Sequence, residues 1–329
     1  MTSRVARALL RIACASLVIS TLSAAGAAPA AAWPTRAVRV VTPGAPGSGM
    51  DATARLLAEQ LEKRWKQPIV VENRPGADGF LAIGSFLEAK DGHALLFTTH
   101  SAITVTPLLH DKVPYDPGSD LVPISHVVDD FLAIVTEPAS PARSLADLVG
   151  LARARPQALN FAAAPGSPYL AFVAFQRGVG IELTHVGYRS MVAAIPDLTS
   201  GRIQVAVMPL ALVVDHARSG KVRLMAVTNE TRAAAAPDVP TVAEAGFPVL
   251  TFAGVLGLFG PREMAASLRE QIATDVRASL QEGNVRRRLE SLGLLARGGS
   301  PAEFAATIDE QRAKWAAIAR AYGARPPQP

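Results

Sequence analysis

Short apolar runs alternate with helical patterns along most of the chain. The runs are rich in Val, Ile, Leu and Thr, a composition that favours β-strands. They lie at residues 36–42, 68–72, 94–99, 131–137, 159–164, 183–188, 203–209 and 222–228. Several are apolar almost throughout, as expected for strands covered on both faces, and their alternation with helices is typical of βαβ units. The pattern therefore predicts an α/β protein with mainly parallel sheets flanked by helices.

Two helices can be placed from their apolar stripes and end signals. The first begins near Asp51, and its apolar residues fall on one stripe: Ala54, Leu57, Leu61 and Trp65. The second begins at Ser300, where Glu303 completes a predicted capping box, and it ends at Gly323. Both are scaffold features to which we assign no function.

Residues 1–32 are predicted to be a secretory signal. Three early arginines precede an apolar run of small residues, and Ala30-Ala31-Ala32 forms a cleavage site before Trp33. The run is interrupted by serine and threonine and is short for a membrane span of ~20 apolar residues. Cleavage near Ala32 predicts a soluble mature protein in the periplasm.

Composition narrows the chemistry of the mature chain. Cys14, the only cysteine, lies in the signal, which excludes disulfides, thiolate metal sites and cysteine nucleophiles. Removing the three arginines of the signal leaves 30 basic against 28 acidic residues, so the formal charge falls from +5 to +2. Without a basic run, and with only 5% aromatic residues, nucleic acid is not an expected partner.

Three kinds of catalytic site lack their sequence signals. The histidines show no spacing typical of a zinc site: His93, His100, His110, His126, His185 and His216. No serine lies in a G-x-S-x-G turn, and no Walker A motif is present. We therefore expect neither a metal site nor an enzyme of these classes.

Two segments are suited to carry the chain between two lobes. One is residues 127–141, and the other is the glycine-rich stretch 254–261. If the chain crosses between the lobes twice, it returns to the first lobe, which then consists of two separate segments of sequence. The predicted organisation is a first lobe of residues 33–128 plus 255–329 and a second lobe of residues 129–254.

The stretch VTPGAPGSGMDATARLL (41–57) allows two interpretations. Gly47, Gly49 and Ala52 spell the G-x-G-x-x-A of a dinucleotide-binding turn, and Glu72 ends the next strand, where a ribose-binding acid belongs. Against this NAD(P)-linked oxidoreductase, five residues widen the loop after the strand, and exported proteins meet little free NAD(H). Alternatively, the glycines expose the N–H groups of a helix start to an anion.

Five segments together resemble one family. They are PGAPGSGMD (43–51), ENRPGADG (72–79), VPYDPGSDLVPIS (113–125), DVPTVAEAGFP (238–248) and GGSPAEFAATIDEQRAKWA (298–316). Their order and spacing resemble the Bug-type extracytoplasmic receptors of the tripartite tricarboxylate transporter family over essentially the whole mature chain. The resemblance implies a two-lobed, type II-like periplasmic-binding-protein fold with a ligand cleft between the lobes. It also implies a monomer without cofactor that carries a small carboxylate to a membrane permease.

The resemblance further implies that two strand-to-helix turns, one from each lobe, hold the ligand. The residues predicted to line the site are Gly44, Ala45, Gly47, Ser48, Gly49, Asp51, Thr99, Ser101, Ala164, Gly166, Ser167, Tyr169, Tyr188 and Arg189. In the second turn, Ser167 is the expected N-cap and Pro168 the first helical residue. One helix start contributes about 0.3–1 kcal/mol, up to ~2, whereas micromolar binding needs about 8 kcal/mol, so both turns must act together.

Several alternatives stay open at the level of the sequence. Asp51 either favours the helix start or meets an amine or hydroxyl group of the ligand. Gly44, Ser48 and Met50 depart from the family pattern, and so do the prolines of the second turn, which suits a bulkier acid or reflects loop drift. Arg189 is either a ligand contact or a solvated arginine. A ligand sensor for a membrane signalling partner would have the same sequence features as a transport receptor.

Overall fold

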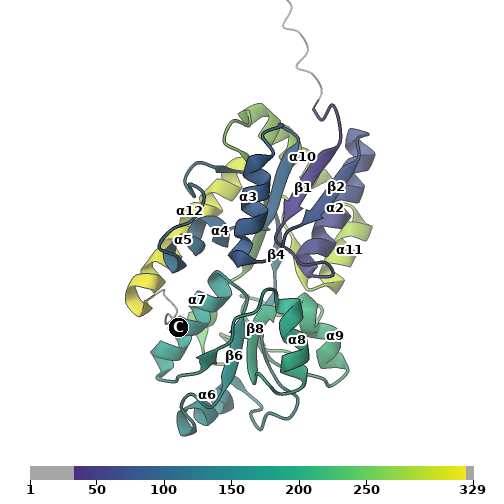
Figure 1. Cartoon of the computed structure of the whole chain (residues 1–329). Coiled ribbons are helices and arrows are strands. Elements are labelled where there is room, and N and C mark those ends of the chain that lie inside the picture. Colours follow the sequence, from purple (N-terminus) through teal and green to yellow (C-terminus); the bar gives the residue numbers. More distant parts are fainter. Residues whose placement is uncertain (1–32, 324–329) are drawn as a thin grey trace, which may run out of the picture. The chain divides into compact units, whose positions relative to one another are not determined.

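The computed structural model describes residues 33–323. The predicted signal with Cys14 and the cleavage site near Ala32 lies outside these residues, as does the terminal RPPQP. From Arg36 onward the chain forms one compact unit that holds two β-sheets, each flanked by helices (Figure 1). We call each sheet with its helices a lobe. Strands up to Asp130 and from Gly254 onward belong to the first sheet, and the strands between them form the second.

The first sheet has the strand order β11-β4-β10-β3-β1-β2. Its strands are β1 (Val38–Thr42), β2 (Ile69–Asn73), β3 (Ala94–Thr99), β4 (Leu121–Asp130), β10 (Gly254–Pro261) and β11 (Leu294–Ala296). The helices of this lobe are α2 (Gly49–Trp65), α3 (Phe80–Glu88), α4 (Ser101–Thr104), α5 (Thr106–Leu109), α10 (Ala266–Leu280), α11 (Gly283–Ser291) and α12 (Pro301–Tyr322). A 3₁₀ turn, η1 (Ala77–Gly79), precedes α3.

The second sheet has the order β7-β6-β8-β5-β9. Its strands are β5 (Leu132–Thr136), β6 (Asn160–Ala163), β7 (Thr184–His185), β8 (Val205–Pro209) and β9 (Arg223–Val227). The helices of this lobe are α6 (Leu145–Ala154), α7 (Ser167–Val179), α8 (Met191–Thr199) and α9 (Leu210–Arg218), followed by a 3₁₀ turn, η2 (Pro248–Leu250).

The two-lobed α/β fold is confirmed, but the expectation of mainly parallel sheets is wrong. Strands β1, β2 and β3 pair in parallel, as do β6, β7 and β8, because helices connect them. The strands that carry the chain between lobes, β4, β5 and β10, pair antiparallel with their neighbours. Both sheets are therefore mixed, since a strand that enters a sheet from the other lobe is not bound to the direction of a βαβ unit.

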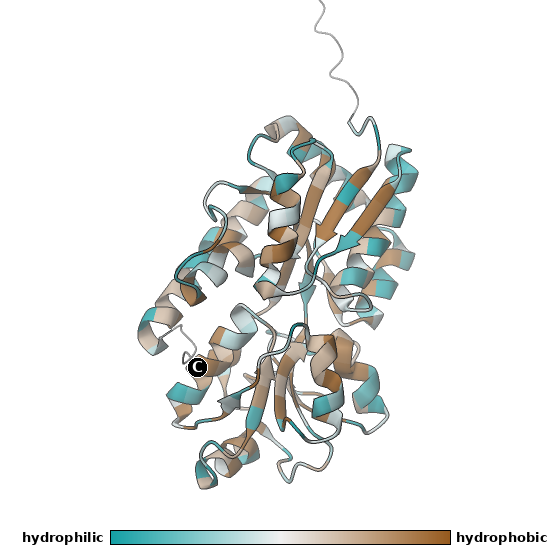
Figure 2. Ribbon diagram, in the orientation of Figure 1, coloured by the Kyte–Doolittle hydropathy of each residue, from teal (hydrophilic) through white to brown (hydrophobic). Residues whose placement is uncertain are grey.

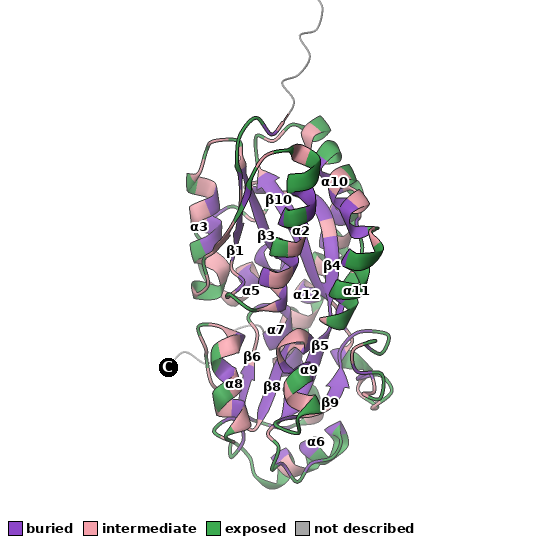
Figure 3. Cartoon of the chain, turned by 90° about the vertical axis from the view of Figure 1, so that its right-hand side faces the viewer, coloured by how far each residue is buried: buried purple, intermediate pink, exposed green. Residues whose placement is uncertain are grey.

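The position of β5 in the second sheet explains why its sequence is apolar throughout. Leu132 and Ile134 face a core shared with α6 and α7, whereas Ala133 and Val135 face a second core shared with α8 and α9. Alternate residues of a strand point to opposite faces, so both faces of this sheet are covered. Most strand residues are brown in Figure 2 and buried in Figure 3, except at the edge strands β2 and β7, and exposed residues lie on the outer sides of the surrounding helices and in loops.

Both helices predicted from end signals are confirmed. Helix α2 begins at an N-cap, Ser48, whose side chain accepts a hydrogen bond from Asp51 N. Helix α12 has the full capping box between Ser300 and Glu303 and ends at Gly323, whose φ of 75° suits glycine. Among the described helices, none combines the length and apolarity that crossing a membrane requires.

Candidate functional site

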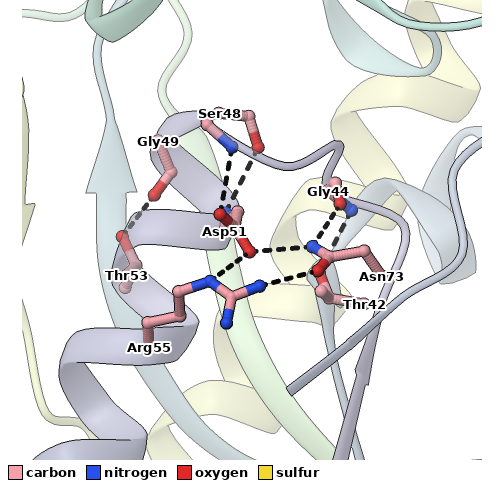
Figure 4. A network of polar contacts seen from close by, with 9 residues as sticks. Thr42, Gly44, Ser48, Gly49, Asp51, Thr53, Arg55 and Asn73 are labelled. Carbon is pink, nitrogen blue, oxygen red and sulfur yellow. Dashed lines mark hydrogen bonds and ion pairs between the residues drawn. The ribbon is translucent and has the colours of Figure 1, made fainter.

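The turn between β1 and α2 is held by the carboxylate of Asp51. Gly47 N donates to Asp51 Oδ2 at 3.0 Å, Asn73 Nδ2 donates to Oδ1 at 2.8 Å, and Arg55 Nε lies 2.9 Å from Oδ1 (Figure 4). Ser48 Oγ in turn accepts from Asp51 N at 3.2 Å. Gly47 has a φ of 80°, which glycine adopts without strain. The turn is therefore fixed by its own polar groups.

Asp51 is ionised within this turn. Burial raises the pKa of Asp51, but hydrogen bonds from Asn73, Gly47 and Arg55 outweigh burial and bring the pKa below its ordinary value. A carboxylate in the first helical turn complements the helix dipole, and the Arg55 cation offsets its charge. The negative charge of Asp51 thus stabilises the turn without being directed into the adjacent cavity, which its side chain does not line.

Two backbone N–H groups of the turn remain available. Within residues 33–323, no acceptor is recorded for the N–H of Gly49 or of Met50, the first two residues of α2. The first N–H groups of any helix have no partner inside the helix. Both residues line the cavity, so the start of α2 offers donors and a partial positive charge to a ligand there.

The second turn, between β6 and α7, differs from its prediction. Gly166, with a φ of 84°, is the N-cap, and α7 begins at Ser167, so Ser167 is not the cap. Its hydroxyl lies 3.1 Å from Ser101 Oγ, and Ser167 N donates to the same oxygen at 3.3 Å. Ser101 opens α4 in the first lobe. Ser167 therefore forms hydrogen bonds to the other lobe and does not cap its own helix.

The space between the two turns is a cavity of about 210 Å³. Ten of the predicted residues line it: Gly44, Ala45, Ser48, Gly49, Thr99, Ser101, Ala164, Ser167, Tyr188 and Arg189. The volume is below the ~300 Å³ typical of pockets for drug-sized ligands and suits a small metabolite. The structure thus brings most of the predicted residues to one place.

Four predicted residues do not line the cavity. Gly47 and Asp51 shape the first turn, and Gly166 shapes the second. Tyr169 is buried and stacks on Phe161 with ring centroids 6.5 Å apart, so it packs in the core of the second lobe. A tyrosine in a helical turn gives no sequence signal that separates a core ring from a ring facing ligand.

Further lining residues were not predicted. They are contributed by the 76–79 loop, the starts of α8 and α9, and the crossing strands, and include Asp78, Asp130, Ser190, Pro209 and Gly254. The ENRPGADG segment was identified as a motif but given no role, although its glycines signalled a tight loop at a strand end. The remaining lining residues could not be predicted, because only the sheet topology brings the ends of their strands together at one edge.

Tyr188 and Arg189, which lie between β7 and α8, border the cavity in different ways. Tyr188 donates its hydroxyl to Asp197 at 2.7 Å, and burial together with this hydrogen bond raises its pKa to about 12. The hydroxyl hydrogen is therefore already donated within the second lobe. Arg189 has no ion pair recorded among the described residues, and a Cβ at Gly76 in the first lobe would lie 3.6 Å from its Nε. This cation therefore reaches across toward the opposite wall.

Asp130 is the unexpected polar group of the cavity. It is 8% exposed, and its Oδ1 is buried without a hydrogen-bond partner among the described residues. Burial and, to a smaller extent, the neighbouring Asp129 raise the pKa of Asp130 to about 8. This carboxyl group is therefore neutral at pH 7 and can donate a hydrogen bond.

The structure also bears on metal and dinucleotide chemistry. Among residues 33–323, no three His, Cys, Asp or Glu side chains cluster in a way that could hold a metal ion. Glu72, the acid on which the dinucleotide alternative depends, pairs with Arg39 at 2.7 Å and with Arg74 at 2.5 Å. Its carboxylate is occupied by these arginines.

Two lobes that enclose a small cavity between strand ends and helix starts define a solute-binding protein of the two-lobed class. Comparison with known sequences specifies the family, because the profile of the tripartite tricarboxylate transporter family receptors matches residues 53–324. The chain belongs to this family.

Three similar proteins illustrate the family. Protein BugT of Bordetella pertussis is 29% identical over 318 residues, covering 95% of this chain and 98% of BugT. Rpa4515 of R. palustris, solved with adipate, superposes with a TM-score of 0.84 at 28% identity, covering 89% of this chain and 100% of that structure. MatC of Rhodopseudomonas palustris, solved with bound malate, gives 0.81 at 27% identity, covering 87% and 99%. The predicted resemblance to Bug-type receptors is confirmed.

Proposed function

We propose that this protein is a periplasmic receptor that captures a small organic carboxylate between its lobes and delivers it to a membrane permease. The observation that carries the proposal is the pair of turns, one from each lobe, that border a single cavity. The N–H groups of Gly49 and Met50 supply donors on the first-lobe side. Arg189, from the second lobe, supplies a cation for the same anion.

The second turn supports an acid with an apolar part. Pro165 and Pro168 line the cavity and carry no N–H, so the second lobe contributes apolar surface and the Ser167 hydroxyl there. The similar proteins solved with malate and adipate both hold dicarboxylic acids. We therefore propose dicarboxylates of four to six carbons as the first candidates, ahead of tricarboxylates, amino acids and aromatic acids.

A thermal-shift screen of residues 33–329 tests the proposal. The panel contains mono-, di- and tricarboxylates, amino acids and aromatic acids, with NADH as the probe for the dinucleotide alternative. A ligand at a hundred times its Kd adds about 2.7 kcal/mol to the free energy of unfolding and so raises Tm. Stabilisation by at least one carboxylate and none by NADH is expected. Stabilisation by NADH alone, or by no acid, would refute a carboxylate receptor.

Transport and sensing require a separate measurement. Ligand uptake by cells that carry the receptor and its candidate permease should fall when the receptor is deleted and recover when it is supplied. Unchanged uptake with an altered transcriptional response to the ligand would favour the sensor alternative.

A further inference from the structure

Asp130 lies where the chain leaves the first lobe. It is the last residue of β4, and Phe131 alone separates it from β5. Its side chain lines the cavity beside Leu132 from β5 and Gly254 from β10. Asp130 thus borders the cavity on the segment that carries the chain from one lobe to the other.

This carboxyl group has no partner within the described chain. No hydrogen bond is recorded to either of its side-chain oxygens; Oδ1 is fully enclosed, whereas Oδ2 keeps accessible surface and is the oxygen that a ligand in the cavity can reach. A buried polar group without a partner costs about 1–3 kcal/mol, and native proteins retain few of them. The surroundings accommodate the side chain, since a Cβ at Gly254 would lie only 3.0 Å from Asp130 Cβ. The absence of a side chain at Gly254 therefore makes room for the unpaired carboxyl group of Asp130.

We infer that the Asp130 carboxyl group hydrogen-bonds a second oxygen of the ligand, distinct from the carboxylate held at the start of α2. This inference rests on the proposed function and names its ligand class more closely. The site takes acids with two oxygen-bearing groups, such as dicarboxylates and hydroxy acids. A plain alkyl monocarboxylate leaves Asp130 buried and unpaired, and sites that hydrogen-bond a substrate reject analogues lacking that group strongly.

A protonated Asp130 can contact an anionic ligand. Because its pKa is raised to about 8, Asp130 donates a hydrogen bond at pH 7 instead of repelling a second carboxylate. Asp129 on the same strand is the charged group that acts on the pKa of Asp130, and it is itself paired with His126 and Arg297. Leu132, Gly254 and Asn229 contribute no charge from the neighbouring segments. Asp78 and Arg189 are the ionisable groups that line the cavity elsewhere, together with Tyr188.

A structural role at the crossing is the competing explanation. Asn229, which follows β9, is also buried, and its Oδ1 has no partner among the described residues. Its amide nitrogen donates to the backbone oxygen of Asp130 at 3.4 Å. If both polar groups serve only to position the crossing, replacing Asp130 should change stability without changing the choice of ligand.

Calorimetric titration with matched acids separates these explanations. The probes are butyrate with succinate and hexanoate with adipate, pairs that differ by one terminal carboxyl group. The variants are Asp130→Asn, which keeps a donor and an acceptor, and Asp130→Leu, which keeps neither. Glu137→Gln is the control, because burial also raises the pKa of Glu137, whose side chain does not line the cavity.

At pH 6.5 the wild type and Asp130→Asn should prefer the diacid of a pair at least tenfold. Asp130→Leu should lose that preference by tenfold or more, mainly through weaker diacid binding, and Glu137→Gln should keep it. Between pH 6.5 and 9.5 the preference should fall in the wild type and stay constant in Asp130→Asn, a comparison that holds even if Asp130→Leu does not fold.

Two results overturn the inference and can be told apart. Binding of the diacids with the same preference and the same pH profile in wild type and variants removes Asp130 from ligand recognition but leaves the receptor function intact. Failure of all four acids to bind the wild type removes this inference together with the proposed dicarboxylate ligands.

Discussion

Two adjacent aspartates at the end of β4 experience opposite environments. Asp130 is buried without a partner, and its pKa rises to about 8. Burial also raises the pKa of Asp129, but the hydrogen bond and charge of His126 and the pair with Arg297 outweigh it, so the net shift is downward. Alternate residues of a strand face opposite sides, which places one acid in the cavity and the other in an ion-paired cluster.

Asp130→Asn should stabilise the ligand-free protein increasingly as the pH rises. The unfolded chain releases this proton near pH 3.8, whereas the folded protein holds it to about pH 8. Folding therefore takes up a proton in this window, and wild-type stability falls as the pH rises through it. We expect the Tm of the variant, relative to that of the wild type, to rise by at least about 2 °C between pH 4.5 and pH 8.5.

Asp129→Asn should have the opposite sign. Its folded-state pKa lies below 3.8, so its contribution to stability is present above that value and is lost as the pH falls below it. Loss of a charge-assisted pair with Arg297, whose Nε lies 2.6 Å from Asp129 Oδ2, should cost about 1–3 kcal/mol at pH 7. Urea unfolding at pH 7 and pH 3 measures this. A variant as stable as the wild type at pH 7 would contradict the assigned role of the pair.

Local chemistry explains which site residues could be predicted. Asp51 lies in the first helical turn, one of the two roles considered for it, and Ser48, predicted only to line the site, is the N-cap of that helix through a contact over three residues of sequence. Ser167 was assigned to the same role but hydrogen-bonds Ser101, 66 residues away, and no local pattern reports such a contact. Asp130 was not predicted either, because its burial depends on strands contributed by both lobes.

At the level of elements, each of the two turns that border the cavity contains a glycine that lies against the other lobe. A Cβ at Gly166 would lie 2.7 Å from Ser101 Cβ, and a Cβ at Gly49 would lie 3.0 Å from Ala211 Cβ in α9. These contacts leave no room for a side chain when the lobes meet. Gly166 also needs glycine for its φ of 84°.

We therefore expect Gly49→Val and Gly166→Val each to weaken carboxylate binding by tenfold or more, about 1.4 kcal/mol. The cause is obstructed approach of the lobes together with a disturbed turn. Titration of the best ligand from the screen measures the effect. Gly150→Ala in α6 is the matched control, because its Cβ meets nothing within 4 Å and it should stabilise by about 0.5–1 kcal/mol with unchanged affinity. Normal affinity in both well-folded valine variants would argue against paired turns.

Some strands of the fold could not be predicted from local sequence patterns. Eight of the strands follow from short β-rich runs, but β4, β10 and β11 were not predicted as strands. β4 contains Pro123 and polar residues, and β10 carries three glycines, so neither has a strand-like pattern. Their pairing is set by the crossing between lobes, which is a property of topology and not of local propensity.

At the scale of the whole molecule, apolar packing around α12 joins the two lobes on one side. Helix α12 places Phe304 in a core of the first lobe and Trp315, 1% exposed, in a core of the second. Trp315 meets Phe252 edge to face, with centroids 5.6 Å apart. Val105, between α4 and α5, joins the same second-lobe core. This side is fixed by buried area, so movement between the lobes is expected at the cavity side.

At the cavity side, the Ser101–Ser167 contact is the hydrogen bond expected to form on closure. Its two hydroxyl oxygens lie 3.1 Å apart on α4 and α7, and Ser167 N adds a second bond to Ser101 Oγ. A hydrogen bond contributes about 0.5–1.5 kcal/mol, so Ser101→Ala or Ser167→Ala should weaken ligand binding roughly two- to tenfold. Replacing both serines should cost little more than Ser101→Ala alone, because Ser101→Ala already removes both bonds, whereas Ser167→Ala removes only the bond between the two hydroxyl groups.

Calorimetry on the single and double variants measures this coupling, and Ser144→Ala is its control. Ser144 caps α6 by accepting from Asp147 N at 3.1 Å, away from the cavity, so its loss should lower stability by about 1 kcal/mol and leave affinity unchanged. If the effects of Ser101→Ala and Ser167→Ala instead add fully, each serine contacts the ligand on its own. In that case closure of the receptor does not depend on a bond between the lobes at this point.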